Sequence, residues 1–234
     1  MDVVIQKAIS IGCIRLSTVN SNPLVFHCVP GAGKSTLIRD LINEDSRFLA
    51  YTFGVADKSS LVARIRDHSE YVKEEAKDKI VIVDEYLEGD FEALGPRIVF
   101  GDPCQSSITS RVLKPNFILS ETKRFGRQTC NLLNILDYNI SSSKEDKVTI
   151  GGIFDLEPAG QVIAFEPEVK NLLRAHSCDF LDICQIRGKT FKTVTFITAV
   201  EWPTAGQEHW FYQALTRHTE EILILSPNAS FPTP

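Results

Sequence analysis

The sequence contains no apolar run of about 18 residues or more, which is the length that a membrane-spanning helix needs. Its first residues also lack the basic stretch followed by an apolar stretch that marks a secretory signal. We therefore expect no direct insertion of the chain into a membrane.

An excess of positive charge is missing too. Lys and Arg number 25 against 30 Asp and Glu, which gives a net charge of -5 at pH 7. A protein that holds nucleic acid by its overall charge is basic, so nucleic-acid binding here would need a local basic groove.

The six cysteines contain no C-x-x-C pair and the five histidines show no metal-binding spacing. Neither a zinc site nor a disulfide framework is expected.

Short apolar runs alternate with helical patterns along the first half of the chain. The segment 35–42 places Leu37, Ile38, Leu41 and Ile42 at helical spacing. The runs that we predict as strands are 24–29, 48–53, 80–83, 98–100 and 117–119. Strands that alternate with helices predict an α/β fold with a parallel sheet.

The alternation stops at residues 139–152 and then begins again. This polar, serine-rich segment ends in Gly151-Gly152 and is predicted to be a surface connection. Beyond it we predict a second, smaller α/β unit with helices at 169–176 and 207–216 and strands at 161–165, 181–184, 194–198 and 222–225. The predicted domains are 1–122 and 123–234.

A glycine-rich segment lies between the first predicted strand and the first predicted helix. Glycines there let successive backbone amides face one phosphate, and the helix N-terminus adds positive potential. We expect the Lys34 ammonium to reach the β- and γ-phosphates and the Ser35 hydroxyl to bind magnesium. The expected ligands are ATP or another NTP and Mg²⁺, held by Pro30, Gly31, Ala32, Gly33, Lys34, Ser35 and Thr36. Cys28 stands where the full pattern has its first glycine.

Two carboxylates directly follow the β-branched run at 80–83. In a nucleotide site Asp84 would hold magnesium through water, and Glu85 would polarise the attacking water as general base. An isolated Asp-Glu pair would instead indicate a charged turn. After a phosphate-binding loop the catalytic interpretation is favoured.

A third polar turn, Gly101-Asp102-Pro103-Cys104-Gln105, follows the run at 98–100. The neutral Gln105 amide could contact both the γ-phosphate and the attacking water, and the alternative is a structural turn.

A small nucleoside or nucleotide kinase would share the phosphate loop. It would need neither this turn nor the Thr216-Arg217 pair, so the kinase is disfavoured.

These motifs together resemble the helicase domain of alphavirus-like plant viruses, a superfamily 1 RNA helicase type. The resemblance covers nearly the whole chain and rests on 30–36, Val83-Asp84-Glu85-Tyr86, 101–105, Thr122-Lys123-Arg124-Phe125-Gly126, Arg187-Gly188-Lys189-Thr190-Phe191 and Ala214-Leu215-Thr216-Arg217-His218. It implies two small RecA-like P-loop NTPase units with parallel sheets. Arg187 stands where the fifth motif commonly has glutamine.

The small size of the chain is similar to that of the first triple gene block movement proteins of potexviruses and carlaviruses. This resemblance implies an RNA-stimulated NTPase and helicase that binds single-stranded viral RNA, moves through plasmodesmata and suppresses RNA silencing. It also implies contacts with other viral movement proteins and host silencing factors, with a homo-oligomer as an open alternative. The implied location is the host cytoplasm, with plasmodesmata as a second site. The large inserted subdomains of processive helicases are missing, so strong unwinding is not expected.

Arginines of the second half are candidates for a catalytic role. A nucleotide site that closes between two units needs positive charge from the second unit, and the planar guanidinium pairs well with phosphate oxygens. Arg124 and Arg217, which lie in the matched motifs, are the candidates, and surface salt bridging is the alternative.

The local basic groups for RNA are Lys123, Arg124 and Arg127, and then Arg187, Lys189 and Lys192, with the hydroxyl of Thr190 beside the second group. Phe191 could stack on a base or belong to the core.

Two function hypotheses remain open. The chain is either an RNA-stimulated NTPase that remodels RNA, or an RNA-binding transport and silencing-suppressor protein in which hydrolysis is secondary.

Overall fold

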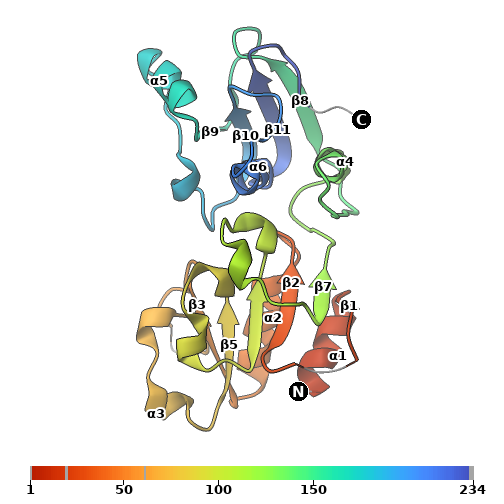
Figure 1. The fold of residues 1–234 in the computed structure, drawn as a ribbon, viewed down its shortest axis with the longest axis vertical. Helices are drawn as coiled ribbons and strands as arrows, with labels where there is room; N and C mark the ends of the chain where they lie inside the picture. The colour runs from red at the N-terminus through yellow and green to blue at the C-terminus, as the bar shows by residue number, and fades with distance from the viewer. Residues whose placement is uncertain (1, 19–20, 61, 232–234) are drawn as a thin grey trace. The chain divides into compact units, whose positions relative to one another are not determined.

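The computed structural model describes residues 2–18, 21–60 and 62–231 (Figure 1). The chain divides into two compact units, Met1–Ser120 and Glu121–Pro234. The sequence-based boundary falls after residue 122, close to this division. Each unit is described by itself.

Unit 1 is an α/β unit built on a seven-stranded sheet. Its helices and strands are α1 (Asp2–Ser10), β1 (Ile14–Arg15), β2 (Leu24–Cys28), α2 (Lys34–Glu44), β3 (Phe48–Thr52), β4 (Arg66–Asp67), α3 (Lys73–Ala76), β5 (Ile80–Asp84), β6 (Ile98–Gly101) and β7 (Phe117–Leu119). The strand order is β1-β7-β2-β6-β5-β3-β4. All described pairings are parallel except that of β1 with β7. The predicted parallel α/β sheet and its five strands are confirmed.

The sheet of unit 1 buries a hydrophobic cluster on each face, because alternate strand residues point to opposite sides. Leu24 and Phe26 of β2 pack in the cluster that contains Leu37 and Ile38 of α2. Val25, between them, belongs to the cluster on the other face. Burial on both faces explains why these strands are continuous apolar runs. The parallel pairing of β2, β6 and β5 places their carboxyl ends at one edge of the sheet.

Unit 2 contains a four-stranded, all-parallel sheet in the order β8-β11-β10-β9. Its elements are α4 (Arg127–Ile135), β8 (Lys147–Gly152), β9 (Gln161–Ile163), α5 (Pro167–Ala175), β10 (Phe191–Ile197), α6 (Glu208–Leu215) and β11 (His218–Ser226). Val169 and Leu173 of α5 pack in a cluster with strand residues. On α6, Phe211 meets the ring of Phe196 at 5.3 Å.

Two predictions for unit 2 are wrong. The segment 139–152 is not only a surface connection, since β8 forms within it and pairs with β11 from Lys147 to Gly152. The predicted strand 181–184 is reduced to one bridge at Leu181, and Ile183–Gln185 forms a 3₁₀ helix. The Asp182 side chain caps this turn and Gln185 completes a capping box, which favours the helical turn over the strand.

Candidate functional site

The glycine-rich segment forms a tight loop between β2 and α2. Gly31 has φ 77° and Gly33 has φ 100°, both in the left-handed region that favours glycine. Gly33 directly precedes α2, so the unpaired amides of the first helical turn point toward the loop. An anion in the loop would meet backbone N–H groups and the positive end of the helix dipole.

Cys28 does not disturb this loop. It is the last residue of β2, lies opposite Leu119 in the sheet and is only 3% exposed. Burial raises the pKa of its thiol well above the usual value. Its side chain belongs to the core cluster, so the missing glycine lies in the strand, before the turn begins.

Lys34, at the start of α2, lies against the two predicted catalytic carboxylates. Its ammonium nitrogen is 2.7 Å from Asp84 Oδ1 and also donates to Glu85 Oε1. The side chains of Lys34 and Asp84 are 13% and 9% exposed. Residues from the phosphate loop and the end of β5 therefore form one ion cluster, although β6 lies between β2 and β5 in the sheet.

The charges in this cluster depend on one another. Burial lowers the pKa of Lys34, but Asp84 and Glu85 outweigh it and raise the pKa above its usual value. Burial raises the pKa of Asp84 although Lys34 opposes this. The lysine is therefore firmly cationic, and its charge favours the ionised form of Asp84.

The backbone at Glu85 is in an unusual conformation. Its φ is 53°, a region that residues other than glycine seldom adopt, and its amide donates to Asp84 Oδ1 at 3.1 Å. Such local strain is found at functional sites, where the surrounding structure holds it in place. Here the turn brings two consecutive carboxylates to the same lysine.

Gln105 is held by its own turn, the 3₁₀ helix Pro103–Gln105 after β6. Its amide Nε2 donates to Asp102 Oδ2 at 2.8 Å, and the Cys104 amide donates to Asp102 Oδ1 at 3.1 Å. Burial raises the pKa of Asp102 to about 6, with Glu85 adding to the rise. Asp102 was not predicted as a site residue, although its place at the end of a buried strand was a usable signal.

The residues present fit a nucleotide with magnesium. The loop amides and Lys34 suit a chain of phosphates. Asp84 and the half-buried Ser35 hydroxyl are oxygen ligands of the kind Mg²⁺ prefers. The described part of the chain has no group of three or more His, Cys, Asp or Glu residues that could hold a metal ion by themselves. A magnesium ion here would take its other ligands from phosphate and water.

In unit 2 the structure brings two predicted arginine motifs together. The Arg124 guanidinium donates to the carbonyl oxygen of Thr216 at 3.1 Å. Arg217 Nε donates to Gln213 O at 3.1 Å, and Arg217 is 3% exposed. Arg217 is thus a buried side chain fixed on the end of α6, not a surface salt-bridge residue.

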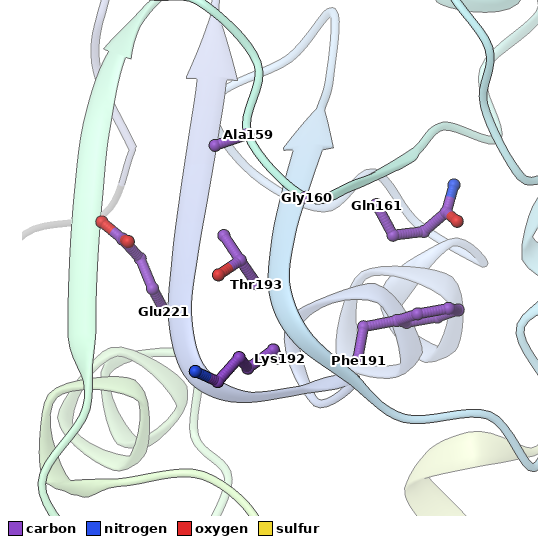
Figure 2. Close-up of a pocket in the computed structure, with 7 residues that line it drawn as sticks. All are labelled: Ala159, Gly160, Gln161, Phe191, Lys192, Thr193 and Glu221. Atoms are coloured by element: carbon purple, nitrogen blue, oxygen red, sulfur yellow. The ribbon is translucent and has the colours of Figure 1, made fainter.

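The predicted RNA-binding residues lie at the start of β10 and in the turn before it. Arg187, Lys189, Thr190 and Lys192 are exposed, and Lys192 Nζ is 3.1 Å from Glu220 Oε2. Phe191 is half-buried. It lines a pocket of about 430 Å³ with Ala159, Gly160, Gln161, Lys192, Thr193 and Glu221. Figure 2 shows Phe191 and Gln161 on one side of this pocket and Lys192 and Glu221 on the other.

A parallel sheet, a glycine loop at a helix N-terminus and a lysine paired with strand-end carboxylates define a protein of the P-loop class. The family model described as the viral superfamily 1 RNA helicase core domain matches residues 24–226. In solved structures the chain resembles an arterivirus nonstructural protein 10 helicase, with a TM-score of 0.54, 18% identity and coverage of 95% of this chain and 56% of that one. The PRRSV helicase gives a TM-score of 0.52 at 17% identity, with coverage of 99% and 53%. The chain thus spans about half the length of these helicases. The family model together with this likeness confirms the superfamily 1 helicase architecture.

Full-length relatives narrow the assignment. The chain is 45% identical to "Movement and silencing protein TGBp1" of Poplar mosaic virus (isolate ATCC Pv275), with coverage of 99% of each chain. It is 43% identical to the protein of that name from Lily symptomless virus, also over 99% of each. The Potato virus X (strain X3) protein of that name is 34% identical, with coverage of 93% of this chain and 95% of the relative. The chain belongs to the TGBp1 family of viral movement and silencing proteins, which have a superfamily 1 RNA helicase core.

No helix in the described ranges is long and apolar enough to cross a bilayer.

Proposed function

We propose that this chain is a magnesium-dependent NTPase stimulated by single-stranded RNA, and that it acts in virus movement and silencing suppression. The observation that carries the enzymatic part is the cluster of Lys34, Asp84 and Glu85 beside the phosphate loop. Family membership supports the same activity. The ligands are ATP or another NTP and Mg²⁺.

The cluster suggests how nucleotide binding would prepare the site. Phosphate oxygens attract the Lys34 ammonium, which then neutralises the β- and γ-phosphates instead of Glu85. Glu85 is released to accept a proton from the attacking water. Mg²⁺, held through Asp84 and Ser35, would supply charge stabilisation on the phosphates. Gln105, oriented by Asp102, would hold the water in line.

Arg124 and Arg217 are proposed to supply positive charge to the phosphates during hydrolysis. Their shared placement at the end of α6 supports a common role, because Arg124 bonds the backbone beside Arg217. Arginine matches phosphate oxygens with a fixed fork of donors. The proposed domains, 1–122 and 123–234, would carry the phosphate loop and these arginines respectively.

RNA contact is assigned to Arg187, Lys189, Thr190 and Lys192. Their exposure supports binding to the phosphate backbone, which carries no base information. Phe191, at the mouth of the adjoining pocket, would add stacking with a base. The expected binding is therefore dependent on salt and largely independent of sequence.

The biological part of the proposal follows the names of the relatives, which are movement and silencing proteins. We infer transport of viral RNA between cells and suppression of RNA silencing in the host cytoplasm and at plasmodesmata. The expected partners are viral RNA, other viral movement proteins and host silencing factors, with self-association as a further expectation.

A second candidate function keeps RNA binding and transport but lacks unwinding, with hydrolysis secondary. It is favoured by one observation, the match to only 56% of the length of an arterivirus helicase. The two candidates predict different behaviour on a duplex with a single-stranded tail.

The test is steady-state hydrolysis of MgATP by the purified chain with and without single-stranded RNA, followed by strand displacement on the tailed duplex. RNA-stimulated phosphate release supports the first candidate, and displaced strand adds helicase activity to it. RNA binding without stimulated release would support the second candidate. Transfer of phosphate to a small acceptor would contradict both.

A further inference from the structure

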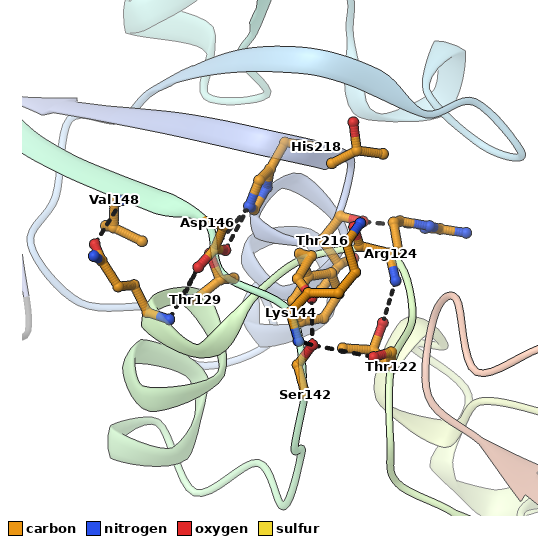
Figure 3. A network of polar contacts seen from close by, with 12 residues as sticks. Thr122, Arg124, Thr129, Ser142, Lys144, Asp146, Val148, Thr216 and His218 are labelled. Carbon is orange, nitrogen blue, oxygen red and sulfur yellow. Dashed lines mark hydrogen bonds and ion pairs between the residues drawn. The ribbon is translucent and has the colours of Figure 1, made fainter.

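A buried polar network in unit 2 connects three segments that are far apart in the sequence (Figure 3). Its centre is His218, the residue after Arg217. His218 Nε2 is 3.1 Å from Asp146 Oδ2 and 3.0 Å from Thr129 Oγ1. The side chains of His218 and Asp146 are both 0% exposed. The aspartate and the histidine are 72 positions apart.

Asp146 also holds the beginning of α4. Its Oδ1 accepts from the Gln128 amide at 2.9 Å and from the Thr129 amide at 3.4 Å. Burial raises the pKa of Asp146, but hydrogen bonds from His218 and Thr129 outweigh it and leave the pKa below its usual value. The ionised carboxylate is therefore bonded to the helix on one oxygen and to the histidine ring on the other.

A second set of bonds joins the same segments at the other side of Arg217. The Arg124 guanidinium donates to Thr216 O, and Lys144 Nζ donates to the Arg124 carbonyl at 3.0 Å. Ser142 Oγ donates to Phe125 O at 2.8 Å. The residues before and after Arg217 are thus each tied to the segment that carries Arg124.

The network costs stability that an apolar core would not. His218 Nδ1 is buried and has no hydrogen-bond partner among the described residues. A buried polar atom without a partner is unfavourable, and apolar residues of similar volume often replace such groups without loss of stability. Some buried polar networks instead fix one arrangement of the chain. The position of this one, directly beside both arginines, points to that role.

We propose that Asp146 and His218 are positioning residues that fix Arg217 and Arg124 in the orientation needed for NTP hydrolysis. The inference rests on the proposed NTPase function. Because the carboxylate can only accept, the bond requires a hydrogen on His218 Nε2. Any replacement that lacks a donor at this point frees the Arg217 backbone from α4.

The test compares His218→Leu, which removes the donor, with His218→Gln, which keeps an amide donor of similar reach. RNA-stimulated kcat should fall by about 10- to 100-fold in His218→Leu, as expected for a misplaced catalytic group, with the KM for MgATP nearly unchanged. His218→Gln should recover part of kcat. Asp146→Asn provides a second route, because Asn has one acceptor oxygen in place of two and cannot accept from both the α4 amides and the ring. The exposed His176 gives the matched control, and His176→Gln should leave kcat unchanged.

A double-mutant cycle separates positioning from general destabilisation. In an Arg124→Ala/Arg217→Ala background, His218→Leu should cause little further loss of kcat, because both groups it positions are gone. If His218→Leu lowers kcat by the same factor in this background as in the wild type, the inference is overturned. Wild-type turnover in folded His218→Leu or in Arg217→Ala would overturn it as well. A wild-type chain that hydrolyses no NTP would overturn the proposed function and this inference with it. If His218→Leu does not fold, the same cycle is run with Asp146→Asn.

Discussion

Replacing Lys34 by Ala would leave the carboxylates of Asp84 and Glu85 side by side without their shared cation. Removal of one partner from a buried ion pair costs about 3–5 kcal/mol, since the other charge stays buried and unpaired. Glu85 is 30% exposed and Lys34 13% exposed, so water relieves part of the cost. We expect Lys34→Ala to lower the free energy of unfolding by about 3 kcal/mol at pH 8.

The loss should depend on pH in a defined direction. Burial already raises the pKa of Asp84, and Lys34 is the cation that lowers it. Without Lys34 the pKa rises further above the unfolded value, so the folded state takes up a proton more readily than the unfolded state. The stability deficit of Lys34→Ala relative to wild type is therefore full above the folded pKa. It shrinks as the pH falls through that pKa toward the lower folded pKa of Asp84 in the wild type.

The assay is urea unfolding of both proteins between pH 5 and pH 8, paired with phosphate release from MgATP. Lys34→Ala should lack hydrolysis at every pH. Adding Asp84→Asn to Lys34→Ala should restore part of the stability but none of the activity. The control is Lys7→Ala, which breaks the surface pair of Lys7 and Glu44 and should cost about 0–1 kcal/mol. If Lys34→Ala is as stable as Lys7→Ala and hydrolyses MgATP normally, Lys34 neither stabilises the two carboxylates nor takes part in hydrolysis.

Three further predictions concern other parts of the site. Asp84→Asn should raise the magnesium concentration needed for half-maximal hydrolysis, and an unchanged magnesium titration would remove Asp84 from the metal site. Burial raises the pKa of Asp102 from its ordinary 3.8 to about 6. As the pH rises from 4 to 6, the free energy of unfolding of the wild type should therefore fall by up to about 3 kcal/mol relative to that of Asp102→Asn. Urea unfolding across this range checks the difference, and parallel curves would contradict it. Replacing Arg187 and Lys189 by Ala should flatten the salt dependence of RNA binding by about one to two units, measured by anisotropy, whereas an unchanged slope would place the RNA surface elsewhere.

The sequence was sufficient for β2, β3, β5, β6 and β7 of unit 1 because each is a continuous apolar run in a parallel sheet. The two-residue strands β1 and β4 are not such runs and were not predicted. The same topology explains why the nucleotide residues could be predicted. Carboxyl ends of parallel strands lie at one edge, so the loop after β2 and the carboxylates after β5 meet there.

Other features depend on long-range contacts that local patterns do not encode. The strand β8 begins with Lys147 and ends in Gly151-Gly152, and it becomes a strand only by pairing with β11. The network of Asp146 and His218 joins residues 72 positions apart. By contrast, the 3₁₀ turn at Ile183–Gln185 had a local signal, the capping pair of Asp182 and Gln185, that the apolar run obscured.

Glu85→Gln tests the central claim most directly, because Gln keeps the size of the side chain but cannot accept the proton of the attacking water. The measurement is MgATP affinity and single-turnover hydrolysis, with RNA present, for the wild type and the variant. Glu85→Gln should bind MgATP with an affinity close to that of the wild type and hydrolyse it about 10²–10⁴-fold more slowly. A Glu85→Gln chain that hydrolyses MgATP at the wild-type rate would contradict the assignment of Glu85 as the base and of this cluster as the catalytic centre.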